Sequence, residues 1–341
     1  MKKNVVFYFF LVFLFFSSLG AVFAQRGTAR NEVVNIRLAS SLPKNSDWGR
    51  ALDRLAAEWQ RVTNNQARVS VSHDGREGNE TKMLSSLSSD AIQVGIFSSV
   101  GVSEICPAVM NLSVPFMIRD ERELDLVLPQ VLPVLENRVK DDFVVIAWSK
   151  SGWVYLFSKE RVLAPDDLRR QKLGTSAELK DMNTVFRTMG FQLVETDWVN
   201  IGTRLASNVI NTVYVIPAII APMQLHKSLN HMLEMPIAPV MGAIVMNRVT
   251  WNKFSAAHQQ EILKAARKIA SEFDSSSVRT EASAIQAMGR DGLSVNRPSQ
   301  AQKDLWIREL NNAVPSLVGA IFDRELYNRI NEILERSRSG R

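Results

Sequence analysis

Two kinds of apolar spacing alternate along the chain after residue 32. Short runs place every second apolar residue on one face, which predicts strands, and longer segments repeat apolar residues every three or four positions, which predicts helices. In chain order these are the strand Val33–Ala39, the helix Asp47–Val62, the strand Arg68–Ser72, the helix Asn79–Leu87 and the strand Ala91–Phe97. Strands that alternate with helices predict an α/β fold with a mainly parallel sheet covered by helices.

The same alternation restarts after Asp141. A short helix is expected to begin around Ala164, and a longer one over Glu178–Met189 ends at Gly190, a residue that commonly stops helices. A turn at Gly152 is expected to separate the first two strands of this part. The expected strands are Phe143–Trp148, Trp153–Phe157, Lys172–Thr175, Phe191–Val194, Asn211–Ile216 and Met241–Asn247.

A long helix is predicted from the capping residue Ser255 to about Met288. At 1.5 Å per residue it would be about 50 Å long, which is enough to contact two domains. The alternative is two shorter helices separated near Ser275–Ser277. Two further helices are expected within Ala301–Leu334, around Pro315. The apolar stripe of the long helix consists of Ile262, Ala265, Ala266, Ile269, Ala270, Phe273, Val278, Ala282 and Ile285.

The first 24 residues have the pattern of a secretory signal. Lys2 and Lys3 precede the uncharged apolar run Val5–Phe16, and Ala24 is a suitable cleavage point. The alternative is an uncleaved anchor, because Val5–Ala24 is about long enough to span a bilayer. Removal of the leader would lower the formal charge from +6 to about +4. The mature protein is therefore expected in the periplasm.

Composition narrows the class of protein further. A mature chain of this length usually makes two domains, and 46% apolar residues can fill their cores. The basic excess is spread along the chain, whereas a nucleic-acid binder concentrates it in a stripe, so no nucleic-acid partner is expected. Cys106 is the only cysteine, which excludes an intramolecular disulfide, and its apolar neighbours predict a buried residue.

Residues that could carry catalysis are scarce. The chain has four histidines and none forms an HExxH pair; no GxSxG elbow, phosphate-binding GxxxxGK[ST] loop or GxGxxG turn is present. The adjacent acids Asp166 and Asp167 suit a helix start, where the helix dipole favours negative charge. The sequence therefore predicts a protein that is not an enzyme, with no metal site and no cofactor.

Six segments, in order, resemble the solute-binding subunits of TRAP (tripartite ATP-independent periplasmic) transporters of the DctP-like type. Each segment is a weak match alone, but together they cover nearly all of the mature chain. They include the opening strand and helix, a Pro-Phe pair before an acidic helix, and the start of the long helix. The matching segments are Ile36–Trp59, Gly75–Leu87, Asp90–Asp125, Leu163–Glu178, Val209–Leu233 and Met246–Ala266.

The resemblance implies a two-domain periplasmic-binding-protein fold, type II-like, with the long helix spanning both domains. Domain I is expected over residues 33–148 plus about 241–275, and domain II over 149–240 plus about 276–335. The implied function is capture of a small molecule between the domains and its delivery to the membrane permease subunits. Some relatives associate with tetratricopeptide-repeat proteins, so a helical-repeat partner is an open alternative.

The chain departs from the family at positions that usually hold the ligand. The resemblance implies an arginine for the ligand carboxylate where this chain has Gly174, and a polar contact after Gly152 where it has Trp153 and Tyr155. Since an arginine is the natural partner of a carboxylate, its absence favours a predominantly apolar ligand. The candidate lining residues are Trp153, Tyr155, Gly174, Tyr214 and Ile216, with Phe97, Phe116 and Met241 behind them.

Two alternatives stay open. An organic acid could bind through a relocated cation, for which the candidates are Arg76, Arg187 and Arg204. Alternatively, the fold could have lost its ligand and serve as a sensor or partner-binding module. An enclosed apolar cavity would favour transport of a hydrophobic solute, and a space filled by side chains would favour the sensor.

Overall fold

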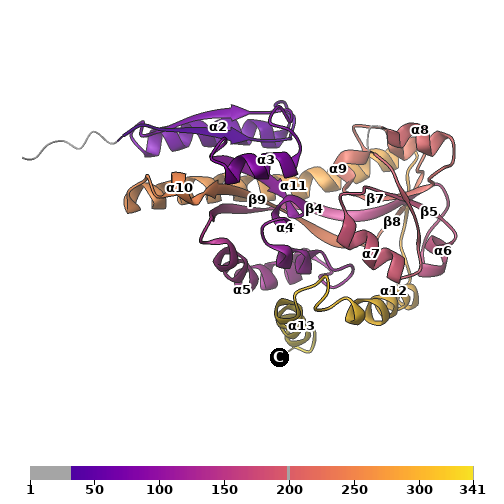
Figure 1. Ribbon diagram of the computed structural model, residues 1–341. Helices are drawn as coiled ribbons and strands as arrows, with labels where there is room; N and C mark the ends of the chain where they lie inside the picture. The colour runs from indigo at the N-terminus through magenta and orange to yellow at the C-terminus, as the bar shows by residue number, and fades with distance from the viewer. Residues whose placement is uncertain (1–31, 198–199, 341) are drawn as a thin grey trace, which may run out of the picture. The chain divides into compact units, whose positions relative to one another are not determined.

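The computed structural model describes residues 32–197 and 200–340 (Figure 1). The expected secretory signal, residues 1–24, lies outside the described residues. The described part contains ten strands in one sheet, with the order β2-β1-β3-β9-β4-β7-β5-β6, while β8 pairs with β4 and β10 with β8. The strands are β1 Val34–Ala39, β2 Ala67–Ser72, β3 Val94–Ser98, β4 Phe143–Ser158, β5 Lys172–Thr175, β6 Gln192–Glu195, β7 Thr212–Val215, β8 His231–Leu233, β9 Ala238–Asn247 and β10 Ser294–Asn296.

Parallel pairing dominates near both ends of this strand order. β1 pairs in parallel with β2 and β3, and β5 pairs in parallel with β6 and β7. The two sets are joined by β4 and β9, which run antiparallel to each other and to their outer neighbours β7 and β3. The predicted α/β class is therefore confirmed.

The expected turn at Gly152 is wrong. Phe143–Ser158 forms one continuous strand, and the pairing of β4 with β9 shifts register between Lys150 and Trp153. Gly152 lies in this irregularity with a φ of +109°, a conformation that glycine adopts without steric cost. The glycine marks a bulge inside a strand rather than its end.

The helices follow the predicted periodicity closely, and helix α2 has the predicted bounds. Among the strands, β5 also has the predicted bounds. Ser46 caps α2, and Ser255 caps α11 by accepting a hydrogen bond from the backbone N–H of His258. Asp167 accepts hydrogen bonds from the backbone N–H groups of Leu163 and Ala164, as expected for an acid at a helix start. The helices are α2 Asp47–Val62, α3 Glu80–Ser88, α4 Ser99–Ser103, α5 Glu121–Val139, α6 Pro165–Arg169, α7 Lys180–Thr188, α8 Ile201–Ala206, α9 Pro217–Ile220, α10 Arg248–Trp251, α11 Ala256–Arg290, α12 Gln300–Ala313 and α13 Arg324–Arg338.

Helix α11 is continuous over 35 residues, so the alternative of a break near Ser275–Ser277 is wrong. The hydroxyls of Ser275, Ser276 and Ser277 donate to carbonyls of their own helix three or four residues earlier. These bonds occupy the hydroxyl groups without interrupting the helix.

Apolar burial fixes the helices on the sheet. Trp59 of α2 is fully buried, and its indole N–H donates across to the carbonyl of Ile262 in α11 at 3.1 Å. Trp306 of α12 donates in the same way to the carbonyl of Leu163 at 3.0 Å. Cys106 is 3% exposed, as predicted, and burial raises the pKa of its thiol.

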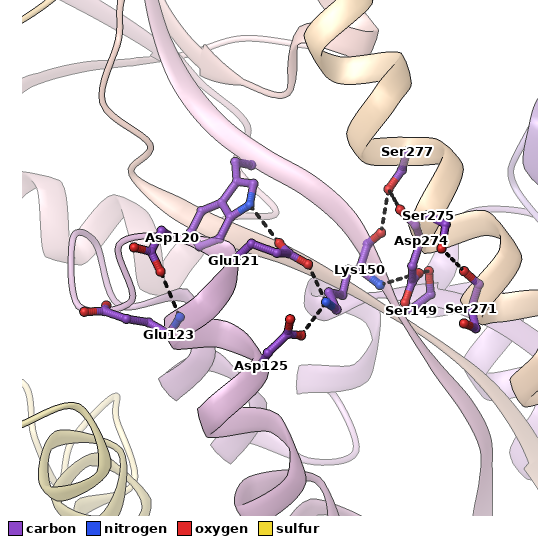
Figure 2. Close-up of polar contacts among 11 residues, drawn as sticks. Asp120, Glu121, Glu123, Asp125, Ser149, Lys150, Ser271, Asp274, Ser275 and Ser277 are labelled. Atoms are coloured by element: carbon purple, nitrogen blue, oxygen red, sulfur yellow. Dashed lines mark hydrogen bonds and ion pairs between the residues drawn. The ribbon is translucent and has the colours of Figure 1, made fainter. Parts of the chain in front are cut away.

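Polar contacts attach β4 to α11 beside the bulge. The Asp274 carboxylate of α11 accepts hydrogen bonds from the Ser149 hydroxyl at 2.8 Å and from the Lys150 backbone N–H at 2.9 Å. The Lys150 ammonium extends toward α5, where it pairs with Asp125 at 2.6 Å and with Glu121 (Figure 2). Lys150 therefore connects α5 and α11 through the strand between them.

We expect Asp274→Ala to lower the free energy of unfolding by about 1–3 kcal/mol, because it leaves a half-buried backbone N–H without its acceptor. Urea unfolding of the mature chain measures the change. The matched control is Asp125→Ala, which removes an exposed partner of the same lysine and should cost less than about 1 kcal/mol. Equal effects for the two variants would contradict the structural role of Asp274.

Candidate functional site

A cavity of about 590 Å³ lies where α2, α3, β3, β9, α9 and α11 approach one another. Trp48 stands at the start of α2 and Phe273 in the middle of α11, with ring centroids 4.1 Å apart and planes inclined by 32°. Because aromatic rings in close contact attract each other, the pair forms one wall of the cavity. The apolar lining residues are Leu42, Trp48, Ile96, Phe97, Ile216, Ala218, Ile219, Pro222, Val240, Met241 and Phe273.

The polar lining consists of hydroxyl groups and carboxylates. The hydroxyls belong to Ser41, Ser46, Ser98, Ser151, Ser276, Ser277 and Thr280. The carboxylates are Asp47, Glu80 and Glu281. Within the described part of the chain, no lysine, arginine or histidine lines this cavity. The site thus combines apolar walls with negative charge.

Glu80 is the first residue of α3, where the helix dipole favours a carboxylate. Its oxygens accept hydrogen bonds from the Ser98 backbone N–H at 3.0 Å and the Ser98 hydroxyl at 2.8 Å. A Cβ on Gly101 would collide with Glu80 Oε2, so a glycine there allows the carboxylate to approach. Burial raises the pKa of Glu80 above its ordinary value, and the negative charge of Glu178 adds to the effect.

Glu281 projects from α11 onto the β4 bulge. Its oxygens accept hydrogen bonds from the Trp153 backbone N–H at 2.9 Å and from the Tyr155 hydroxyl at 3.2 Å. A Cβ on Gly152 would lie 2.7 Å from Glu281 Oε2, so this glycine also makes room for a carboxylate. Burial raises the pKa of Glu281, as does the charge of Glu121, and burial likewise raises the pKa of the Tyr155 hydroxyl.

A second cavity of about 380 Å³ shares Ser277 and Glu281 with the first. Its charged lining residues are Arg119, Lys150, Asp120, Glu121 and Glu281. Lys150 is already paired with Glu121 and Asp125. The smaller cavity therefore contains basic groups that the larger one lacks, but the acids there outnumber them.

The residues expected to line the site separate into three groups. Phe97, Ile216 and Met241 line the larger cavity, and Trp153 and Tyr155 line the smaller one. The remaining three, Gly174, Tyr214 and Phe116, line neither cavity.

Core packing accounts for the three that line neither. A Cβ on Gly174 would lie 2.8 Å from Ile210 Cδ1, a buried core atom. Tyr214 packs on Phe186 at 4.8 Å between ring centroids, and its hydroxyl lies 3.4 Å from Thr175 Oγ1. Phe116 is 1% exposed and packs on Trp306.

None of the three arginines considered as relocated cations lines either cavity. Arg76, Arg187 and Arg204 are exposed, and Arg187 pairs with Glu195 at 2.9 Å. Arg119 and Lys150, which do line a cavity, were missed because the sequence places Arg119 just before an acidic helix and Lys150 in the expected turn between two strands. Four further lining residues were missed because they fall inside predicted helices, where Phe273 belongs to the expected apolar stripe; the other three are Trp48, Glu80 and Glu281.

Two of the histidines form structural contacts and line neither cavity. His73 and His226 are buried and contact Asp53 and Asp291 at 2.8 and 2.9 Å. Among the residues that the structure describes, no group of three or more His, Cys, Asp or Glu side chains could hold a metal ion. Within the same residues, no helix has the length and apolar content of a membrane span.

The raised pKa of Glu281 predicts the direction in which the stability of the protein changes with pH. A carboxyl whose pKa is higher in the folded chain binds its proton more tightly there, so its contribution to stability is present at low pH and is lost as the pH rises through the raised pKa. We therefore expect the melting temperature of the parent protein, relative to Glu281→Gln, to increase between pH 7.5 and pH 5. For the exposed control Glu104→Gln the difference should stay constant, and a difference for Glu281→Gln that shrinks on acidification would refute the assignment.

Comparison with solved structures identifies the fold. The chain superposes on a TRAP periplasmic solute-binding protein from Ochrobactrum anthropi with a TM-score of 0.82, at 15% identity, covering 91% of this chain and 98% of the other; the C-terminus of that protein is bound in its ligand-binding pocket. A protein of the same type from Ralstonia eutropha H16, with bound (S)-2-acetolactate, gives 0.78 at 16% identity, with 89% and 99% covered. One from Sulfurospirillum deleyianum, with bound succinate, gives 0.74 at 16% identity, with 88% and 98% covered.

Sequence comparison gives the family. No curated protein matches the chain. The sequence profile of bacterial extracellular solute-binding protein family 7 (DctP) matches residues 38–318. This is a family of solute-binding proteins rather than of enzymes, and it includes the TRAP subunits that the six ordered segments resemble. The chain belongs to bacterial extracellular solute-binding protein family 7.

Proposed function

We propose that this protein is the periplasmic solute-binding subunit of a TRAP transporter and captures a small solute with a mainly apolar body in the larger cavity. The observation that carries the proposal is the composition of that cavity, which combines about 590 Å³ of space with walls built largely from aliphatic and aromatic side chains. Cavities of this size and polarity are typical of small-molecule sites. The open space also favours capture over the ligand-free sensor, whose cavity would be filled by side chains.

The charge of the lining argues against a carboxylate ligand. Burial of an ionised carboxylate without a cation costs several kcal/mol, and the lining of this cavity has carboxylates and no cation within the described residues. The succinate bound by the relative from Sulfurospirillum deleyianum would meet repulsion here. An organic acid would instead need Arg119 in the smaller cavity, because Lys150 is already paired.

Capture would proceed by closure of two domains, divided as the sequence predicts. In that division Trp48 and Phe97 belong to domain I, and Ile216 and Ile219 belong to domain II, so both domains contribute apolar wall. A solute that contacts both sides favours the closed state by the difference between its affinities for the two states. The closed form would then be delivered to the membrane permease subunits; a helical-repeat partner stays a prediction.

The test is to fill the cavity from an exposed position. Ala218 lies on α9 at the cavity wall and is itself exposed, so Ala218→Trp enters the space without disturbing the core. We expect a solute released by denaturing the parent protein, and detected by mass spectrometry, to fall at least tenfold in yield in this variant. The control Val249→Trp changes a 60% exposed side chain outside both cavities and should retain the solute. Equal yields from both variants would contradict the proposed site.

A further inference from the structure

We propose that the captured solute is an organic cation: an ammonium or amidinium group on an apolar body, held between Glu80 and Glu281. This inference rests on the proposed function and narrows its ligand class. It adds a charge to the predominantly apolar solute expected from the sequence, because the site provides carboxylates as well as apolar surface. The relevant features are two carboxylates that form no ion pair with any residue the structure describes, their remaining hydrogen-bonding capacity, and the aromatic wall beside them.

The first feature is an unbalanced charge. Within the described residues, neither Glu80 nor Glu281 forms an ion pair, and both accept hydrogen bonds only from backbone N–H or hydroxyl groups. The third acid, Asp47, differs because it is 56% exposed and pairs with Arg50. Partly buried carboxylates without a partner are costly. A cationic ligand would supply the missing charge at the two positions that lack it.

The second feature is that these carboxylates are fixed but not saturated. An ionised carboxylate can accept about four hydrogen bonds. Each oxygen of Glu281 accepts one, from Trp153 and Tyr155, whereas Glu80 accepts one at Oε1 and two at Oε2, all three from Ser98. Backbone contacts hold both side chains in place, so little rotamer freedom remains to be lost when a ligand binds. The remaining lone pairs can accept N–H donors from a ligand.

The third feature is the aromatic surface. Trp48, Phe97 and Phe273 line the same cavity as the two carboxylates. The faces of aromatic rings attract cations, and desolvation of the site strengthens this attraction. The same rings also pack well against an apolar body. Carboxylates with aromatic rings fit an organic cation better than they fit an anion or a bare metal ion, and the described residues offer no metal cluster.

A purely structural role for the two acids predicts different behaviour. As acceptors for Ser98 and Trp153, they would stabilise the chain without selecting among ligands. Glu-to-Gln variants separate the roles, because glutamine keeps one acceptor oxygen and the size of the side chain but removes the charge. Stability and ligand charge preference must therefore be measured on the same variants.

The experiment uses the mature full chain, unfolded and refolded to remove co-purified solute, with three probes of similar shape: 2-phenylethylammonium, 2-phenylethanol and 3-phenylpropanoate. Calorimetry should show the ammonium binding at least tenfold more tightly than the alcohol, and the carboxylate binding most weakly. If the ammonium binds no more tightly than the alcohol, including a case in which neither binds, the cation assignment is overturned.

The variants then locate the charge. Glu80→Gln and Glu281→Gln should each weaken binding of the ammonium probe about tenfold and leave the alcohol within twofold. Glu104→Gln, an exposed acid outside both cavities, should change neither. Unchanged ammonium binding in both cavity variants would overturn the assignment even if they melt at lower temperatures.

The identity of the solute released from the parent protein separates this inference from the proposed function. A molecule that is cationic at neutral pH supports both. An organic acid, retained by the control Val249→Trp and lost from Ala218→Trp, would leave the transport role in place and overturn the cation assignment. If no solute is released and none of the three probes binds, both are overturned.

Discussion

The attachment of strand β4 to helix α11 by two carboxylates is the interaction on which the site depends. Asp274 and Glu281 lie seven residues apart, about two helical turns, and therefore face the same strand. The first accepts hydrogen bonds from Ser149 and Lys150, and the second from Trp153 and Tyr155. Between these anchors the strand bulges at Gly152, whose missing side chain leaves space for Glu281. The bulge and the helix thus determine each other's position.

This arrangement has an energetic cost at neutral pH. Burial raises the pKa of Asp274 and of Glu281, which means that the folded chain holds both as anions less readily than water does. Asp274 has the Lys150 ammonium nearby, and the charge of Lys150 opposes the shift. Among the described residues Glu281 forms no ion pair, and the charge of Glu121 raises its pKa further. A local destabilisation of this kind is typical of functional sites, where a ligand compensates for it.

The sequence predicted the elements better than the site, for a physical reason. Helix α2 and the Ser255 cap follow from local spacing and capping chemistry, which a short window of sequence contains. The continuous β4 was missed because a positive-φ glycine is as compatible with a turn as with a bulge. The contact between Glu281 and Trp153 joins residues 128 positions apart, so no local pattern reveals it. Of the expected lining residues, Phe97, Ile216 and Met241 do line the larger cavity; Ile216 was named from the resemblance at the strand before Pro217, and Phe97 and Met241 stand at the end and the start of predicted strands.

The unbalanced carboxylates also bear on how a ligand could drive closure. A ligand shifts a conformational equilibrium only by the difference between its affinities for the two states. Apolar contact depends only weakly on direction, because many arrangements bury apolar surface. On its own it therefore distinguishes poorly between the two states. A cation that neutralises Glu80 and Glu281 together gains most when both carboxylates are close to it and shielded from water, because electrostatic attraction grows as the local dielectric falls. The energetic cost of burying these two acids would thereby favour the closed form with its cation bound.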